Sequence, residues 1–162
     1  MSKILTGGCC CGEVSFQVTD NFKRFFFCHC EQCRKLSGTA HAANLFTSPD
    51  AIEWLKGEHN ITRFNYPDRA LSRAFCKTCG SALPFESQDS SYLLVPAGSL
   101  NEEPSKELDA QIFCEEQTEW HKNGLNGKKA DWLWSRLSSF DKYIKACLQV
   151  NSKVSELKGN SL

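Results

Sequence analysis

The chain has 162 residues, and its 19 lysine and arginine side chains balance 19 aspartates and glutamates, so the formal net charge at pH 7 is zero. This balance excludes an electrostatic argument for nucleic acid or an anionic membrane surface as the main partner. No apolar run approaches the roughly 20 residues that span a bilayer, and residues 1–10 contain no apolar stretch typical of a secretory signal. We therefore expect a cytoplasmic protein that binds neither nucleic acid nor membrane.

Short β-like runs follow one another through the first 114 residues. Residues 13–18 alternate polar and apolar side chains, with Val14, Phe16 and Val18 on one face, which is the pattern of a half-buried strand. Glycine, proline, asparagine and aspartate separate the runs. Strands are further expected at 24–30, 42–47, 52–55, 61–66, 71–76, 82–86, 92–97 and 110–114. Short strands at this spacing predict a mainly β domain of packed antiparallel sheets over residues 1–127.

The pattern changes to a helical one near residue 128. Apolar side chains recur there at steps of three and four, at Leu133, Leu137, Phe140, Ile144 and Leu148. This stripe predicts a C-terminal amphipathic helix over residues 128–150, packed on the sheet, followed by a tail at 151–162. A homodimer contact through Trp132 and Trp134 is the alternative use of this helix.

Ten cysteines are the most informative feature of the composition. Cytosolic thiols stay reduced, and clustered cysteines in such proteins are more often metal ligands than disulfides. A disulfide framework is the alternative, because ten is an even number. Adjacent cysteines such as Cys9, Cys10 and Cys11 do not easily pair with one another, because a bridge needs a wider Cα separation. The sequence therefore favours metal binding.

Two cysteine pairs, remote in sequence, predict a closed site. Cys76-Lys77-Thr78-Cys79-Gly80 is a knuckle in which a tight turn aims two sulfur atoms at one ion, and the glycine permits the left-handed backbone that such a turn often needs. Cys9 and Cys11 share one face of an extended segment, while Cys10 points away. Together these four thiolates would enclose a zinc ion in a structural site.

The segment 28-CHCEQC-33 predicts a different, open site. Cys28 and Cys30 share a strand face, and Cys33 returns from the following turn. His29 points to the opposite face, where it is expected to pack or to support a metal ligand, and not to bind the metal itself. Three local thiolates leave one coordination position vacant, which is the pattern of catalytic zinc. Two alternatives remain: a remote ligand, His41, Cys114 or His121, closes the site, or all seven thiols form one cluster.

Two of the three remaining cysteines and two tryptophans are interpreted as structural. Cys114 in an apolar strand and Cys147 in the predicted helix are expected to be small buried side chains. Trp54 and Trp120 are expected to anchor the core.

These motifs resemble those of the glutathione-dependent formaldehyde-activating enzyme family, which also includes centromere protein V. The similarity covers about residues 5–125. It is carried by the order of three cysteine motifs and by glycine, tryptophan and leucine positions, namely Gly8-Cys9-x-Cys11-Gly12, Cys28-His29-Cys30-x-x-Cys33-Arg34, Gly38, Trp54-Leu55-x-Gly57, Phe75-Cys76-x-x-Cys79-Gly80, Gly98-Ser99-Leu100 and Trp120.

The resemblance implies a β-tent fold and two zinc ions per chain. The structural zinc would be held by Cys9, Cys11, Cys76 and Cys79, and the catalytic zinc by Cys28, Cys30 and Cys33. The implied activity is that of a carbon–sulfur lyase acting on S-hydroxymethylglutathione, the adduct of formaldehyde and glutathione.

This chain departs from the family pattern in the residues around the substrate. Family members often carry a histidine shortly before the late aromatic strand, where this chain has Gln111-Ile112-Phe113, and no general base is evident. Arg34, Lys35 and Arg73 are the candidates for binding the carboxylates of glutathione. A zinc-stabilised protein-binding module without catalysis is the alternative function, and the neutral charge disfavours a chromatin-associated module.

Overall fold

The computed structural model describes residues 3–67 and 71–127. The chain divides into two compact units, residues 1–123 and residues 124–162, and the fold given below is that of the first unit. The predicted helix at 128–150 and the tail at 151–162 lie outside the described residues, as do Cys147, Trp132 and Trp134, so the predicted domain boundaries and homodimer contact stay predictions.

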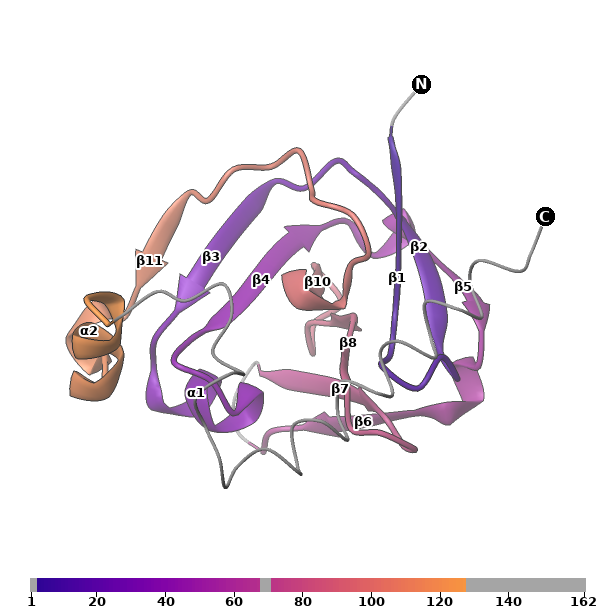
Figure 1. Cartoon of the computed structure of the whole chain (residues 1–162). Coiled ribbons are helices and arrows are strands. Elements are labelled where there is room, and N and C mark those ends of the chain that lie inside the picture. The colour runs from indigo at the N-terminus through magenta and orange to yellow at the C-terminus, as the bar shows by residue number, and fades with distance from the viewer. Residues whose placement is uncertain (1–2, 68–70, 128–162) are drawn as a thin grey trace, which may run out of the picture. The chain divides into compact units, whose positions relative to one another are not determined.

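Short strands account for most of the regular structure (Figure 1). They are β1 (Ile4–Gly8), β2 (Ser15–Thr19), β3 (Arg24–Cys28), β4 (Ala42–Thr47), β5 (Ile52–Lys56), β6 (Ile61–Asn65), β7 (Ser72–Cys76), β8 (Ala82–Leu83), β9 (Phe85–Glu86), β10 (Leu93–Pro96) and β11 (Ala110–Ile112). The described helices are α1 (Glu31–Ser37), α2 (Glu119–Leu125) and the 3₁₀ turns η1 (Pro49–Ala51), η2 (Glu58–Asn60), η3 (Ala97–Ser99) and η4 (Cys114–Glu116). No helix within residues 3–67 and 71–127 is long and apolar enough to cross a membrane.

The strands form three sheets, as Figure 1 shows. Their orders are β1-β2-β5, β11-β3-β4-β10-β9 and β6-β7-β8. Neighbouring strands run antiparallel, except that β11 pairs parallel to β3. The prediction of a mainly β fold with antiparallel sheets is therefore confirmed.

Most predicted strands are present, with three differences. The 42–47 strand has the predicted bounds, whereas the predicted 82–86 strand is divided into β8 and β9 at Pro84, which has no N–H to donate to a ladder. Strand β1 was not predicted. Helix α1 was not predicted either, and it occupies the segment that was interpreted as a turn carrying Cys33.

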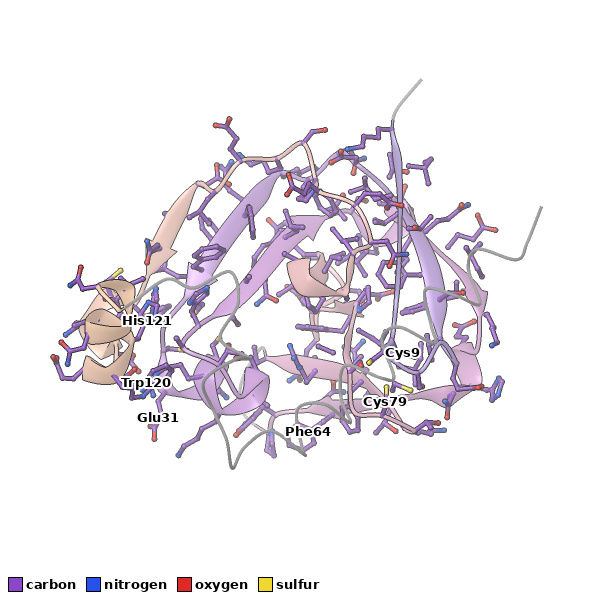
Figure 2. All side chains as sticks on the ribbon, viewed as in Figure 1. Cys9, Glu31, Phe64, Cys79, Trp120 and His121 are labelled. Atoms are coloured by element: carbon purple, nitrogen blue, oxygen red, sulfur yellow. The ribbon has the colours of Figure 1, made fainter. Side chains whose placement is uncertain are left out.

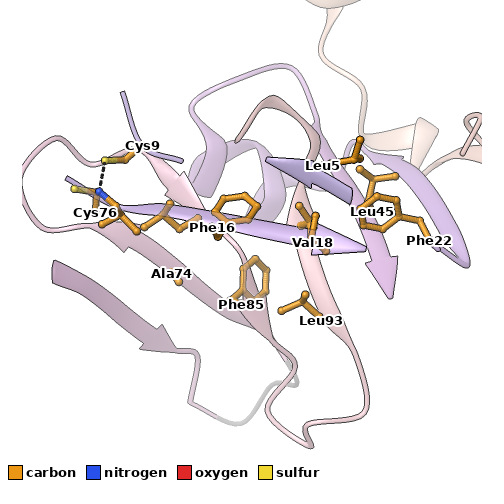
Figure 3. Close-up of a cluster of buried hydrophobic side chains, with 13 residues drawn as sticks. Leu5, Cys9, Phe16, Val18, Phe22, Leu45, Ala74, Cys76, Phe85 and Leu93 are labelled. Carbon is orange, nitrogen blue, oxygen red and sulfur yellow. Dashed lines mark hydrogen bonds between the residues drawn. The ribbon is translucent and has the colours of Figure 1, made fainter. Parts of the chain in front are cut away.

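The core is built from the inward faces of the sheets (Figure 3). Val14, Phe16 and Val18 are buried, as the alternation in residues 13–18 predicts. The Trp54 ring packs edge-on against Phe16, with ring centroids 5.7 Å apart, so its interpretation as a core anchor is consistent with the packing. Trp120 is 62% exposed on α2, and its interpretation as a core residue was wrong. Figure 3 shows Cys9 and Cys76 together at one end of the core.

Candidate metal centres

The four-cysteine group joins two turns that are remote in sequence. Cys9 and Cys11 lie in the turn between β1 and β2, and not on the extended segment that was predicted, because β1 ends at Gly8. The turn is closed by hydrogen bonds from the Cys9 N–H to the Val14 carbonyl and from the Gly12 N–H to the Cys9 carbonyl, each 3.0 Å long. Cys76 ends β7, and Cys79 lies in the turn that follows it.

The sulfur positions fit one tetrahedral ion. All four sulfur atoms lie within 4.8 Å of one another, and the Cys9–Cys11 and Cys11–Cys76 sulfur pairs are 3.4 Å and 3.8 Å apart. A tetrahedral zinc with Zn–S bonds of about 2.3 Å sets neighbouring sulfur atoms about 3.8 Å apart. The described cysteines are all free. The donor set therefore fits zinc, and Figure 2 shows Cys9 and Cys79 side by side.

The protein surrounds these thiols with hydrogen-bond donors. The Val14 N–H donates to the Cys9 sulfur at 3.2 Å, and the Asn60 side-chain amide donates to the Cys76 sulfur at 3.6 Å. Burial raises the pKa of Cys9, but the Val14 N–H and the neighbouring thiols outweigh this and lower it. The Ser81 hydroxyl is the main cause that lowers the pKa of Cys79 to about 6. Donors of this kind stabilise the thiolates that a metal requires.

The turn after β7 has the backbone that the knuckle predicts. Gly80 adopts φ +72°, and its N–H donates to the Cys76 carbonyl at 2.9 Å. Cys76 is fully buried, whereas Cys79 is exposed. One side of the group therefore belongs to the core, and the other lies at the surface.

The three-cysteine group is built at a strand-to-helix junction. Cys28 ends β3, Cys30 is the N-cap of α1, and Cys33 lies in the first turn of that helix. The Cys33 N–H donates to the Cys30 sulfur at 3.4 Å, so a thiol takes the place of the usual oxygen acceptor at this cap. The expectation that Cys28 and Cys30 share a strand face was wrong, because β3 ends at Cys28.

These three sulfur atoms nevertheless converge. They lie within 4.8 Å of one another, with Cys28 and Cys30 3.5 Å apart, which fits three corners of a zinc tetrahedron. Burial is the main cause that raises the pKa of both Cys28 and Cys33. In the part of the chain that the structure describes, no histidine, carboxylate or further cysteine joins this group.

The positions of the side chains decide between the alternatives for the three-cysteine site, namely a remote fourth ligand or one cluster of seven thiols. The seven thiols form two separate groups of four and three, and not one cluster. His41 and His121 cluster with His29 instead of approaching the three sulfur atoms. Cys114 is exposed in η4, so its interpretation as a buried residue was wrong. Whether either cysteine group binds zinc stays a prediction.

A hollow of about 10 Å³ lies next to Cys33 and shares two lining residues with a larger cleft. The hollow is lined by Cys33, Leu36, Ala42, Asn44, Leu71, Ser72, Arg73 and Phe85. It shares Leu36 and Arg73 with a cleft of about 230 Å³ that is also lined by Lys35, Phe64, Phe75 and Gly80. Small-molecule pockets usually measure roughly 300–1,000 Å³, so this cleft has room for part of a tripeptide.

The three basic residues named from the sequence have different surroundings. The Arg34 Nε donates to the His29 carbonyl at 3.0 Å, which fixes it to the backbone. The Lys35 ammonium pairs with Glu31 at 2.8 Å, with both side chains largely exposed. Burial lowers the pKa of Arg73, and the nearby Cys33 thiolate opposes this effect. Arg73 also lines the hollow next to Cys33, so its positive charge lies beside the three-cysteine group.

Asn44 is a candidate site residue that the sequence did not reveal. It lies in β4, and its Oδ1 atom is buried with no hydrogen-bond partner among the described residues. Asn44 lines the same hollow as Cys33, and this hollow, of about 10 Å³, has room for about one water molecule that would bond to the oxygen. No local motif distinguishes it from any other polar residue in a strand.

Comparison with known proteins gives a family and a fold. The family model described as glutathione-dependent formaldehyde-activating enzyme matches residues 4–116. A crystal structure of a Rhodobacter sphaeroides protein is similar to this chain, with a TM-score of 0.53 and 21% sequence identity. The similarity covers 66% of this chain and 99% of that one, and it supports the fold alone.

Proposed function

This chain belongs to the glutathione-dependent formaldehyde-activating enzyme family, and on that basis we propose that it is a zinc-dependent carbon–sulfur lyase. The substrate class is the adduct of a small thiol and an aldehyde, with S-hydroxymethylglutathione as the first candidate. The reaction joins the thiol sulfur to the aldehyde carbon, while the thiol proton passes to the aldehyde oxygen. Cleavage is the reverse of this addition.

One observation carries the proposal. Three cysteine sulfur atoms gather without a fourth ligand from the described residues, next to a small hollow that shares Arg73 with a cleft lined by basic residues. By comparison, the other cysteine group of the same fold has four sulfur atoms, enough to coordinate a zinc ion completely. Structural zinc sites are fully coordinated by protein, and catalytic sites keep a position open.

Cys28, Cys30 and Cys33 would hold the catalytic zinc, and Cys9, Cys11, Cys76 and Cys79 the structural one. Zinc bound at the three-cysteine group supplies Lewis acidity, which stabilises a thiolate or polarises an aldehyde oxygen. Arg73 provides a positive charge beside this group and would bind a substrate carboxylate. Lys35, at the wall of the same cleft, offers a second cation.

Asn44 would orient the adduct. Its unpartnered Oδ1 would accept a hydrogen bond from a water molecule in the hollow, and this water would bridge to the hydroxyl group that forms when thiol and aldehyde combine. No histidine or carboxylate lines the hollow in the described part of the chain. We therefore assign the proton transfer to water, with the protein positioning the reactants.

Turnover of S-hydroxymethylglutathione tests the proposal, with wild type compared against Cys30→Ser. Because thiols add to formaldehyde without a catalyst, the rate without protein is subtracted in each case. We expect wild type to exceed this background and Cys30→Ser to fall to it. Equal rates in the two proteins, or no wild-type rate above background, would overturn the lyase assignment.

The alternative function is a zinc-stabilised protein-binding module. Two exposed aromatic side chains favour it, Phe113 at 49% and Trp120 at 62% exposure, because such residues are enriched at protein interfaces. Under this alternative both cysteine groups serve the fold, and Cys30→Ser leaves every catalytic measurement unchanged. In either function we place the protein in the reducing cytoplasm, where thiols remain available to zinc.

A further inference from the structure

Three of the four histidines gather in space although they are far apart in sequence. His29 follows β3, His41 precedes β4, and His121 lies in α2, where Figure 2 labels it. Their ring centroids are 5.1 to 5.6 Å apart. One nitrogen from each ring lies within 4.8 Å of the other two. We call these residues the histidine group.

The surroundings of His29 leave one of its nitrogens without a partner. The ring is fully buried, and its Nε2 lies 2.9 Å from the Gln111 Oε1. The Gln117 amide donates to the same Gln111 oxygen at 3.4 Å and lies 3.1 Å from the His29 Nε2. The Gln111 oxygen accepts only, so its contact is a hydrogen bond in the tautomer with the ring proton on Nε2, in which the Gln117 amide bonds to Gln111 and not to the ring. The His29 Nδ1 then carries a lone pair, and it is buried without a hydrogen-bond partner among the described residues.

His41 shows the same feature. Its Nδ1 is also buried and has no hydrogen-bond partner among residues 3–67 and 71–127. The ring stacks on Phe27 with centroids 4.3 Å apart, which restricts its orientation. An unpaired buried nitrogen costs about 1–3 kcal/mol. Two such nitrogens in one cluster call for a ligand that satisfies both.

We propose that His29, His41 and His121 bind a divalent transition-metal ion of the zinc type. Three imidazoles suit zinc, nickel, copper or iron, and three protein ligands leave a position for an exogenous one. Gln111 would act as the hydrogen-bond acceptor that fixes the His29 tautomer, an arrangement common around metal-bound histidines. Zinc–nitrogen bonds of about 2.0–2.1 Å require nitrogens about 3.3 Å apart, so small ring rotations close the site. The proposal does not depend on the lyase function.

Zinc titration of the full-length, tag-free protein tests this site. The protein is first saturated at its cysteine groups under reducing conditions and passed through gel filtration, and calorimetry then counts further zinc ions. The variant is His121→Gln, because His121 is partly exposed on a short helix and its loss spares the core. His59→Gln is the matched control, since His59 is the fourth histidine and is exposed outside the group.

We expect wild type and His59→Gln to bind one zinc ion more per chain than His121→Gln. We also expect added zinc to shift the ring nitrogen NMR signals of His29, His41 and His121, and not those of His59. Equal zinc binding by wild type and His121→Gln would overturn the proposal. So would loss of the extra ion in His59→Gln, or wild-type titration without any shift of the three rings.

Discussion

The two cysteine groups differ in how far along the chain they reach. The four-cysteine group connects the β1–β2 turn to the turn after β7, and 65 residues separate its two pairs. The three-cysteine group occupies one junction, from the end of β3 to the first turn of α1. A metal ion in the first group ties remote segments together, whereas one in the second restrains only local backbone. The sequence separation between the cysteines therefore distinguishes a group that stabilises the fold from one that is available for catalysis.

Their surroundings differ in the same direction. The four-cysteine group receives hydrogen bonds from Val14 and Asn60, and Cys76 is part of the core. The three-cysteine group lies beside a hollow that contains Arg73 and Asn44. One set of neighbours satisfies the sulfur atoms, and the other offers groups to a ligand.

The largest expected effect is loss of the fold in Cys76→Ser. Metal-binding energy at a closed cysteine site is largely folding energy, so we expect a loss of more than about 4 kcal/mol out of the roughly 5–15 kcal/mol that stabilises a domain. Thermal unfolding and soluble yield measure it. Cys10→Ser is the control, because Cys10 is exposed in the same turn and outside the group. If Cys76→Ser unfolded like Cys10→Ser, the structural assignment would be wrong.

The second effect is loss of activity with the fold retained, in Cys30→Ser. Serine is a strong N-cap, so the substitution keeps an acceptor for the Cys33 N–H while removing one sulfur ligand. We expect turnover to fall by more than about 100-fold, since even residues that only support metal ligands cost 10–100-fold. The unfolding midpoint should move far less than in Cys76→Ser. A variant that unfolds as readily as Cys76→Ser would remove the distinction between the groups.

A smaller effect is expected when the charge beside the open group is removed. Arg73→Gln should raise KM for the glutathione adduct about 10-fold with kcat nearly unchanged, because a carboxylate contact formed equally in ground and transition states affects binding alone. Arg24→Gln is the control, since Arg24 is an exposed cation on β3. Steady-state kinetics separate the two constants. An unchanged KM in Arg73→Gln would show that another residue binds the substrate carboxylate.

The smallest effect concerns the order in which acid removes zinc. Burial raises the pKa of Cys28 and Cys33, whereas the pKa values of Cys9 and Cys79 are lowered. Cys11 is the exception in the four-cysteine group. The Glu13 N–H lowers its pKa, but burial and the neighbouring thiols outweigh this and raise the pKa to about 12. A thiol with a raised pKa keeps its proton up to a higher pH, so the proton competes more strongly with the metal ion for the sulfur atom. As pH falls, zinc should leave the three-cysteine group first, and a colorimetric chelator should register two steps. Cys33→Ser assigns the two steps: we expect it to lack the step at higher pH, and loss of the step at lower pH instead would contradict this order.

The cysteine groups were predictable because their signal is local. Each turn needs its two or three thiols at short spacing, and the glycine at 80 marks the knuckle. Helix α1 was not predictable from periodicity, because none of its residues is buried and its N-cap is a cysteine. Cys114 and Trp120 illustrate a related failure, since apolar character alone does not tell whether tertiary packing covers a side chain.

The histidine group and Asn44 show what the sequence leaves out. His29, His41 and His121 meet because β3 and β4 pair and α2 follows β11, which lies beside β3. No spacing rule connects three residues brought together by sheet pairing. Asn44 becomes notable only through its buried, unpartnered oxygen, which is a property of packing.

The central claim is that cysteines from remote segments hold two zinc ions, one enclosed by four sulfur atoms and the other bound by three. Zinc-edge X-ray absorption combined with elemental analysis tests it on protein purified under reducing conditions. We predict two sulfur-bound zinc ions per chain in wild type, and in Cys33→Ser a single sulfur-bound zinc ion with four sulfur ligands. Protein free of sulfur-bound metal, with the same cysteines joined in disulfides by mass spectrometry, would contradict the account.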